Sequence, residues 1–197
     1  MTTAAAPLTL ADALPLTRWR TATLVIGAAL LTAVAAQVRV PLGFTPVPVT
    51  GQTFAVLLVG AALGARKAAA SQALYWVMAA IGLPVFSDLR GGWEVATGAT
   101  AGYVFGFILA AWLVGALAER GQDRSFLTSV PTMLMGSVVI YTTGVLWLSR
   151  SIDVPLYTGD GRDAFTLGLT PFIVGDLLKV VLAAALTPAA WALVKRD

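Results

Sequence analysis

Long apolar runs that are nearly free of charge are the feature that most limits what this chain can fold into. Six such segments follow one another along the 197 residues. They are residues 21–38, 52–65, 68–83, 100–118, 126–148 and 170–194. About 20 apolar residues in a helix cross the hydrocarbon core of a bilayer, and a helix satisfies its own backbone hydrogen bonds there. The pattern therefore predicts an all-α integral membrane protein, a bundle of six transmembrane helices.

The composition agrees with a membrane protein of one domain. Hydrophobic residues make up 58% of the chain and charged residues only 12%, about half the charged fraction of a soluble domain. Because the chain is too short for two membrane domains, we expect one domain over residues 1–197. It would consist of an N-terminal segment, residues 1–20, and a bundle, residues 21–194. The second and third spans are short, and Arg66-Lys67 between them predicts a tight hairpin at the membrane surface.

Basic residues divide unevenly between the two sides of this bundle. Six spans put both termini on one side, which then carries eight of the thirteen Lys and Arg residues, whereas the other side carries four. The eight are Arg18, Arg20, Arg66, Lys67, Arg120, Arg124, Lys195 and Arg196, and the four are Arg39, Arg90, Arg150 and Arg162. Because short cytoplasmic loops carry the excess of positive charge, both termini are expected to be cytoplasmic. The external loops, residues 40–51, 84–99 and 149–169, are then the long ones.

Two opposite charges lie inside the last predicted span, in the run Gly175-Asp176-Leu177-Leu178-Lys179. Asp176 and Lys179 are three residues apart, so they share one face of a helix. Asp176 would lie about 9 Å inside the span. Ionisable groups at such depth are costly and mark functional sites. The alternative is a structural ion pair that neutralises itself, although apolar residues would fill the same place at lower cost. We expect a site that opens outward.

Two external loops supply further candidates for this site. Three prolines hold the first loop extended, and Thr50 is expected to cap the second span. Gln52 would then lie at the mouth of the bundle, where an amide can both donate to and accept from a ligand. In the second loop, Arg90 can hold a carboxylate with its planar guanidinium. For these loops a rigid linker and a solvated loop with local ion pairs remain the alternatives.

Small residues recur every four positions in two spans. Gly98, Gly102 and Gly106 open the fourth span, a spacing that favours close helix packing. Tyr103 lies beside them, near the mouth of the predicted site. In the first span, Ala29 and Ala33 form a similar pair, which either packs inside the bundle or offers a smooth face to a partner helix.

Several classes of function are excluded by what the sequence lacks. With no Cys and no His, disulfides, thiol catalysis, haem and ordinary zinc sites are not expected. No phosphate-binding loop or hydrolase motif occurs, so no enzyme activity, cofactor or metal is predicted, and the chain cannot power transport with ATP by itself. The dispersed basic residues do not indicate a nucleic-acid partner. The hydrophobic pattern also shows no clear inverted repeat of the kind found in autonomous transporters.

These stretches together resemble the BioY family, whose members are the substrate-binding S components of energy-coupling factor (ECF) biotin transporters. The resemblance runs from about residue 21 to the C-terminus. It rests on Thr45-Pro46-Val47-Pro48-Val49-Thr50-Gly51-Gln52-Thr53, Ala80-Ile81-Gly82-Leu83-Pro84-Val85-Phe86, Gly102-Tyr103-Val104-Phe105-Gly106-Phe107, Val139-Ile140-Tyr141 and Pro171-Phe172-Ile173-Val174-Gly175-Asp176-Leu177-Leu178-Lys179. Two departures are Ala99, where the family often has Pro, and Ser137, where it often has Asn.

The resemblance implies a biotin site in the outer half of the bundle. By this likeness, Asp176 and Lys179 bind the ureido end, Gln52 matches a glutamine of the family, and Arg90 falls where a carboxylate-binding arginine lies. The remaining lining residues expected are Thr50 and Tyr103. The family's alanine motif in the first helix, which contacts a transmembrane coupling subunit, maps onto Ala29 and Ala33. The implied partners are biotin, that coupling subunit, two ATPase subunits and the lipid bilayer of the cell membrane.

Three other functions remain open at this point. A small membrane enzyme would have to use Asp176 and Lys179 as its acid–base pair. A self-sufficient biotin carrier would act without partners, as a homo-oligomer. An S component for another vitamin would keep the fold and change the ligand.

Overall fold

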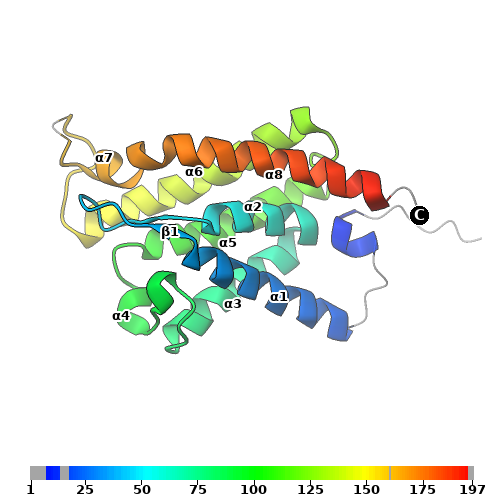
Figure 1. The fold of residues 1–197 in the computed structure, drawn as a ribbon, viewed down its shortest axis with the longest axis horizontal. Coiled ribbons are helices and arrows are strands. Elements are labelled where there is room, and N and C mark those ends of the chain that lie inside the picture. Colours follow the sequence, from blue (N-terminus) through cyan, green and yellow to red (C-terminus); the bar gives the residue numbers. More distant parts are fainter. Residues whose placement is uncertain (1–7, 14–17, 160, 195–197) are drawn as a thin grey trace, which may run out of the picture.

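The computed structural model describes residues 8–13, 18–159 and 161–194. Long helices dominate these residues and run side by side (Figure 1). The helices are α1 (Arg18–Gln37), α2 (Gln52–Leu63), α3 (Ala65–Ala80), α4 (Trp93–Ala96), α5 (Ala101–Ala118), α6 (Phe126–Ser151), α7 (Ala164–Gly168) and α8 (Ile173–Val194). Three 3-10 turns, η1 (Leu10–Ala13), η2 (Ser87–Leu89) and η3 (Thr170–Phe172), complete the helical elements.

Each of the six predicted spans corresponds to one helix of the structure, but the helices differ in length. By length and composition, four helical stretches of the described residues could cross a membrane: Trp19–Gln37, Ala101–Ala118, Phe126–Ser151 and Ala164–Val194. In contrast, α2 has 12 residues and α3 has 16, which at 1.5 Å per residue gives roughly 18 and 24 Å. The structure thus shows an all-α membrane protein with four long apolar helices and two shorter ones between them.

The turn between α2 and α3 lies at Gly64, not at the predicted Arg66-Lys67. Gly64 has φ +78°, a conformation that favours glycine, and both basic residues fall in the first turn of α3. The carboxylate of Glu119, at the end of α5, accepts a hydrogen bond from the Ala65 backbone N–H at 2.9 Å. This bond satisfies one of the free amides at the start of α3, so a side chain of a neighbouring helix stabilises the tight turn.

Glycines bring α5 and α6 together, as their spacing predicts. A Cβ atom at Gly102 would overlap Trp147, and one at Gly106 would lie 2.9 Å from the Ile140 Cα atom. The close approach of the two backbones therefore requires glycine at both positions. Gly98 lies before α5, and a Cβ atom there would meet the backbone of α4 and not α6. Its contact with α6 is a hydrogen bond that its carbonyl oxygen accepts from Trp147 Nε1 at 2.9 Å.

A short β-hairpin, which the sequence analysis did not predict, frames the first long loop. Strand β1 (Arg39–Val40) pairs antiparallel with β2 (Val49–Thr50). The loop between them turns at Leu42–Thr45, where the Thr45 backbone N–H donates to the Leu42 carbonyl oxygen at 3.3 Å, so the predicted extended loop is wrong over these residues. The Thr45 hydroxyl donates to the Leu167 carbonyl oxygen of α7 at 2.8 Å. The first and third long loops are thus tied together at one end of the bundle.

The N-terminal segment was predicted only as a cytoplasmic extension, and part of it, residues 1–7 and 14–17, lies outside the described residues. The remainder packs against the bundle. Thr9 is 1% exposed, and Lys67 donates to Asp12 at 2.7 Å. The described segment therefore covers the start of α3 with a buried threonine and a surface ion pair.

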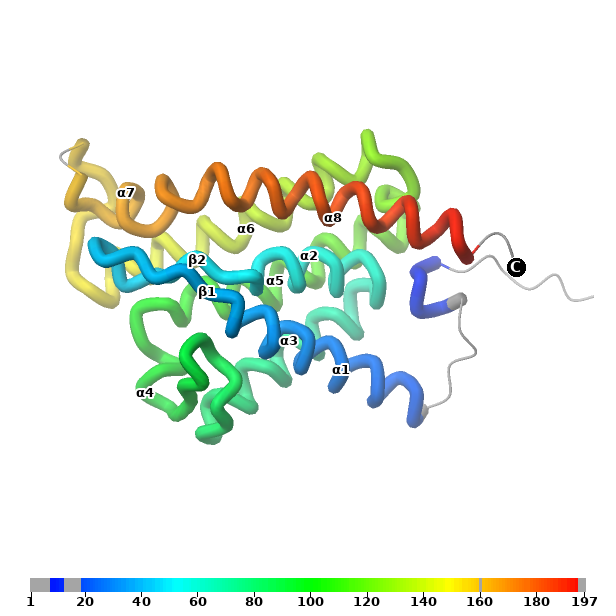
Figure 2. The backbone as a smooth tube through the Cα atoms, viewed as in Figure 1, coloured from blue at the N-terminus to red at the C-terminus, as the bar shows by residue number. Residues whose placement is uncertain are grey.

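The start of α1 and the end of α8 lie at the same end of the bundle (Figures 1 and 2). The β-hairpin, α4 and α7 lie at the opposite end, where the long loops cluster. Residues 195–197, and with them Lys195 and Arg196, lie outside the described residues.

Candidate functional site

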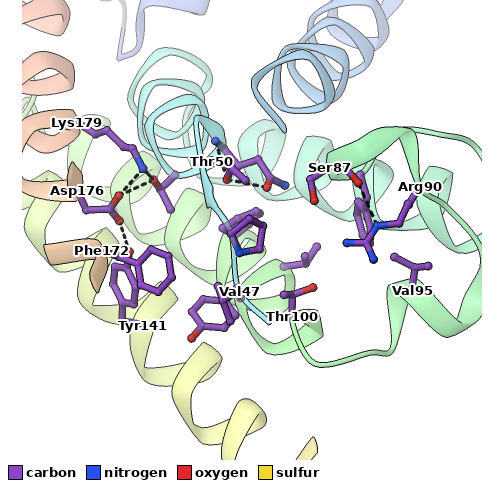
Figure 3. Close-up of a pocket in the computed structure, with 17 residues that line it drawn as sticks. Val47, Thr50, Ser87, Arg90, Val95, Thr100, Tyr141, Phe172, Asp176 and Lys179 are labelled. Atoms are coloured by element: carbon purple, nitrogen blue, oxygen red, sulfur yellow. Dashed lines mark hydrogen bonds and ion pairs between the residues drawn. The ribbon is translucent and has the colours of Figure 1, made fainter. Parts of the chain in front are cut away.

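A cavity opens at the end of the bundle that carries the long loops. Its walls come from α2, α5, α6 and α8, from the β-hairpin loop and from the loop that follows α3. The lining residues are Val47, Pro48, Thr50, Gln52, Thr53, Phe86, Ser87, Arg90, Val95, Thr100, Tyr103, Val104, Phe107, Tyr141, Phe172, Asp176 and Lys179. Aromatic and aliphatic side chains form most of this surface, and a few polar groups lie at its ends (Figure 3), the arrangement typical of sites for small molecules.

Asp176 and Lys179 form an ion pair at one end of the cavity. The Lys179 Nζ atom lies 2.6 Å from Asp176 Oδ1. The sequence pattern predicts that Asp176 lies deep inside a helix that begins at Thr170. In the structure η3 precedes α8, so Asp176 lies in the first turn of α8. The positive end of the helix dipole therefore also stabilises this carboxylate.

Two residues that the sequence analysis did not assign to the site complete the polar cluster. The Thr53 hydroxyl donates to Asp176 Oδ1 at 3.2 Å and accepts from Lys179 Nζ at 3.1 Å. The Tyr141 hydroxyl donates to Asp176 Oδ2 at 2.5 Å. Asp176 is only 5% exposed, and these donors compensate the loss of water around it. Both residues lie in motifs of the BioY resemblance, but nothing in those motifs indicates a contact with Asp176.

Gln52 and Thr50 are part of the cavity wall and bond to each other. The Thr50 hydroxyl donates to Gln52 Oε1 at 2.9 Å, and Gln52 Nε2 donates to the Tyr75 hydroxyl at 2.8 Å. The amide is thereby held from both sides. The predicted capping role of Thr50 is wrong, because Thr50 ends β2 and Gly51 is the N-cap residue of α2.

Tyr103 lies in the cavity wall with its hydroxyl engaged by the chain itself. This hydroxyl donates to the Gly168 carbonyl oxygen of α7 at 2.8 Å. The ring packs against Gly144, where a Cβ atom would overlap it, and stands edge-on to Tyr141 at a centroid distance of 6.1 Å. Tyr103 therefore contributes an apolar ring face to the cavity and ties α5 to α7.

Arg90 lies at the other end of the cavity from the ion pair (Figure 3). Its Nε atom donates to the Ser87 carbonyl oxygen at 3.3 Å, and its backbone pairs with Phe86. The loop is anchored to the first helix region because Gln37 bonds the Phe86 carbonyl oxygen and Arg39 pairs with Asp88. Within the part of the chain that the structure describes, the Arg90 guanidinium forms no ion pair, so it is available to an anionic ligand.

Ala29 and Ala33 do not form an exposed face. Ala29 is 0% exposed and Ala33 is 8% exposed, because α1 turns this stripe toward the other helices. Both residues belong to the main hydrophobic core together with Ala28. Their burial fits the alternative of internal packing, and docking of a partner helix at this stripe stays a prediction.

The fold and the cavity define a class of protein: a membrane-embedded helix bundle that can hold a small solute between a charged pair and a distant arginine. Comparison with known proteins identifies the family within this class. The model of the BioY family matches residues 5–196, and the chain belongs to this family.

Named relatives agree with the family assignment. The biotin transporter BioY of Thermotoga maritima is 40% identical over 154 residues, which cover 78% of this chain and 85% of that protein. The biotin transporter BioY of Rhizobium etli is 36% identical over 166 residues, which cover 81% and 86%. A crystal structure described as the S-component for biotin from an ECF-type ABC transporter has a similar fold. Its TM-score is 0.76 at 23% identity, with 88% of this chain and 93% of that chain covered.

Proposed function

We propose that this chain is a multi-pass protein of the cell membrane that binds biotin and transports it as the S component of an ECF-type transporter. Its relatives are named biotin transporters, and a similar fold occurs in a biotin S-component. Together they favour a transporter over a membrane enzyme. In this proposal residues 1–197 form a single membrane domain of six spans.

The observation that carries the proposal is the distribution of polar groups along one cavity. Biotin has a ureido ring with two N–H donors and a carbonyl, an apolar bicyclic body and a terminal carboxylate. Asp176 can accept from a ureido N–H, and Lys179 can donate to the ureido carbonyl. Arg90, at the far end (Figure 3), can hold the carboxylate. Burial of such complementary groups penalises ligands that lack one of them.

The remaining lining residues have supporting roles in this proposal. The rings of Tyr103 and Tyr141 supply apolar area for the body of the ligand. Gln52 and Thr50, which bond each other, offer their free donor and acceptor positions to the ring system.

Biotin binding by the purified chain is the direct test. Calorimetry in detergent should show saturable binding of biotin, and mass spectrometry after gentle purification should detect biotin as the retained ligand. A different retained vitamin, together with a flat biotin titration, would show an S component of another specificity. Conversion of the ligand during incubation would instead favour the enzyme.

Energy for accumulation has to come from other subunits, because the sequence holds no phosphate-binding loop. We propose a complex with a transmembrane coupling subunit and two ATPases. Uptake of labelled biotin should therefore require co-expression of these subunits in a host that lacks all ECF components. Full uptake by the chain alone would favour the self-sufficient carrier, which would then act as a homo-oligomer.

A further inference from the structure

The ion pair of the cavity is held by side chains from two other helices. Thr53 belongs to α2 and Tyr141 to α6, whereas Asp176 and Lys179 both belong to α8. Figure 3 shows the three dashed contacts that converge on the Asp176 carboxylate. The orientation of this carboxylate is therefore set in part by side chains that do not belong to α8.

Thr53 acts on both members of the pair with one hydroxyl group. A threonine hydroxyl has one donor and two acceptor positions. Here it donates to Asp176 Oδ1 and accepts from Lys179 Nζ. The two charged groups and the hydroxyl form a closed triangle, because Lys179 also bonds Asp176 Oδ1 at 2.6 Å. This triangle fixes the pair on α8 relative to α2.

Tyr141 fixes the other oxygen of the carboxylate. Its ring lies between two aromatic neighbours, with centroid distances of 6.1 Å to Tyr103 and 6.3 Å to Phe172, so the direction of the hydroxyl is constrained. Tyr141 and Asp176 also line an apolar groove between α6 and α8 on the other side of this wall. Their 2.5 Å hydrogen bond therefore joins the two helices between the cavity and the groove.

Counting hydrogen-bond positions shows what these contacts leave free. An ionised carboxylate offers about four acceptor positions and an ammonium three donors. Among the described residues, Asp176 accepts from Lys179, Thr53 and Tyr141, and Lys179 donates to Asp176 and Thr53. About one acceptor position on Asp176 and one donor on Lys179 remain. The edge of a cyclic urea, with one N–H beside one C=O, matches the free acceptor position on Asp176 and the free donor on Lys179.

We propose that Thr53 and Tyr141 are positioning residues that occupy the surplus hydrogen-bond positions of Asp176 and Lys179 and thereby make the site selective for the edge of a cyclic urea. This inference rests on the proposed function, because it takes biotin as the ligand. It adds to that function the two side chains on which ligand selectivity depends.

Substitutions at Thr53 separate the hydroxyl from the shape of the side chain. Thr53→Val keeps the shape and removes the hydroxyl, and Thr53→Ser keeps the hydroxyl and removes the methyl group. We expect Thr53→Val to weaken biotin binding about tenfold, as loss of hydrogen bonds to charged groups does, and Thr53→Ser to bind as the unsubstituted chain does. A pure packing role would give the opposite order, with Val tolerated and Ser impaired. Thr142→Val is the matched control, because Thr142 follows Tyr141 on α6, is exposed, and is not among the residues that line the cavity.

Substitution at Tyr141 tests selectivity directly. Tyr141→Phe keeps the ring between its aromatic neighbours and frees one acceptor position on Asp176. The ligands to compare are biotin and a biotin derivative methylated on one ureido nitrogen, with calorimetry on protein that elutes as a folded species. We expect the affinity of Tyr141→Phe for biotin to fall about tenfold. We also expect the ratio of the affinity for biotin to the affinity for the methylated derivative to be clearly smaller than in the unsubstituted chain, because the effects of coupled groups do not add. Tyr157→Phe, in the exposed third long loop, should leave both affinities unchanged.

The outcomes distinguish this inference from the function on which it rests. One outcome is that the unsubstituted chain binds biotin while Thr53→Val and Tyr141→Phe show the same affinity for biotin and the same ratio of affinities for biotin and the methylated derivative. In that case the inference is wrong and the function stands. If Tyr141→Phe weakens both ligands equally, Tyr141 is only structural and the selectivity claim fails. If the unsubstituted chain does not bind biotin, the proposed function falls and takes this inference with it.

Discussion

The ion pair of the cavity is largely shielded from water, with 7% of the Asp176 side chain and 17% of the Lys179 side chain exposed. Removing one charge of such a pair leaves the other charge buried without its partner. We therefore expect Asp176→Asn and Lys179→Met each to weaken biotin binding by at least ~2 kcal/mol. Calorimetry on folded protein measures this loss, and Lys67→Met, which breaks the surface pair with Asp12, serves as the control. Unchanged affinity in both cavity variants would make the pair structural only.

Single residues differ in how far the sequence reveals their role. Asp176 and Lys179 are visible because charges inside an apolar span are rare. Thr53 and Tyr141 are not, since a threonine or a tyrosine in a span has many ordinary explanations, and their contact with Asp176 depends on how three helices meet. For the same reason the spacing of Ala29 and Ala33 cannot tell an internal stripe from an external one, whereas the structure shows both residues buried.

Among the helices, strands and turns, the sequence predicts the long elements and misses the short ones. The six long apolar runs predict α1, α2, α3, α5, α6 and α8 to within a few residues, because burial in lipid depends mainly on the run itself. The β-hairpin, α4 and α7 were not predicted, since segments of two to five residues carry too little periodicity to recognise. The charged pair Arg66-Lys67 predicts the turn two residues too late, because the first turn of α3 accommodates both charges while Gly64 supplies the positive φ.

The glycines of α5 give a prediction about helix packing. Gly106→Val would place side-chain atoms against Thr143 and the backbone of Ile140, and backbone shifts of this kind cost about 1–3 kcal/mol. We expect a lower melting temperature in detergent, followed by intrinsic fluorescence. Gly27→Ala is the control, because a Cβ atom there meets nothing within 4 Å and alanine favours the helix. Equal melting temperatures for Gly106→Val and the parent chain would show that close packing of α5 and α6 is dispensable.

The short helix α7 gives a prediction about pH. Hydrogen bonds from the backbone N–H groups of Thr158 and Thr166, at 3.0 and 2.7 Å, hold the pKa of Asp163 well below its usual range. The unfolded chain has the ordinary value of about 3.9. The stability that this carboxylate contributes is therefore present above about pH 4 and is lost as the pH falls toward the lower folded pKa.

Asp163→Asn isolates this contribution, because asparagine keeps an acceptor for the helix cap but carries no charge. At pH 7 the variant should melt at a lower temperature than the parent chain. The difference between the two should shrink when melting is repeated at pH values below 4. A difference that is constant with pH would assign the effect to shape and not to charge.

The arrangement of the complete bundle supports an even number of crossings. The start of α1 and the end of α8 lie at one end, and the long loops and the cavity lie at the other (Figure 1). Arg66, Lys67, Arg120 and Arg124 lie in or beside the short turns. The sequence predicts the side on which each turn lies because charge and span order are local properties. It also predicts an outward-opening site, and the six residues predicted to line that site all line the cavity. It does not predict the shape of the cavity or its other walls, which form only when α2, α5, α6 and α8 pack together.

Orientation in the membrane is the prediction that links this architecture to uptake. The excess of basic residues among the turns at the terminal end indicates that this end is cytoplasmic, so the cavity should face outward to capture its solute.

The chain has no cysteine, which allows single labels to be placed without prior substitution. Gly43→Cys lies in the hairpin loop, where a Cβ atom meets nothing within 4 Å, and Gln122→Cys lies in the exposed turn between α5 and α6. An impermeant maleimide added to intact cells should label position 43 and not position 122, and both positions should react after the membrane is opened with detergent. The reverse pattern in intact cells would turn the cavity toward the cytoplasm, and the bundle would then be oriented for export or for release, not for capture from outside.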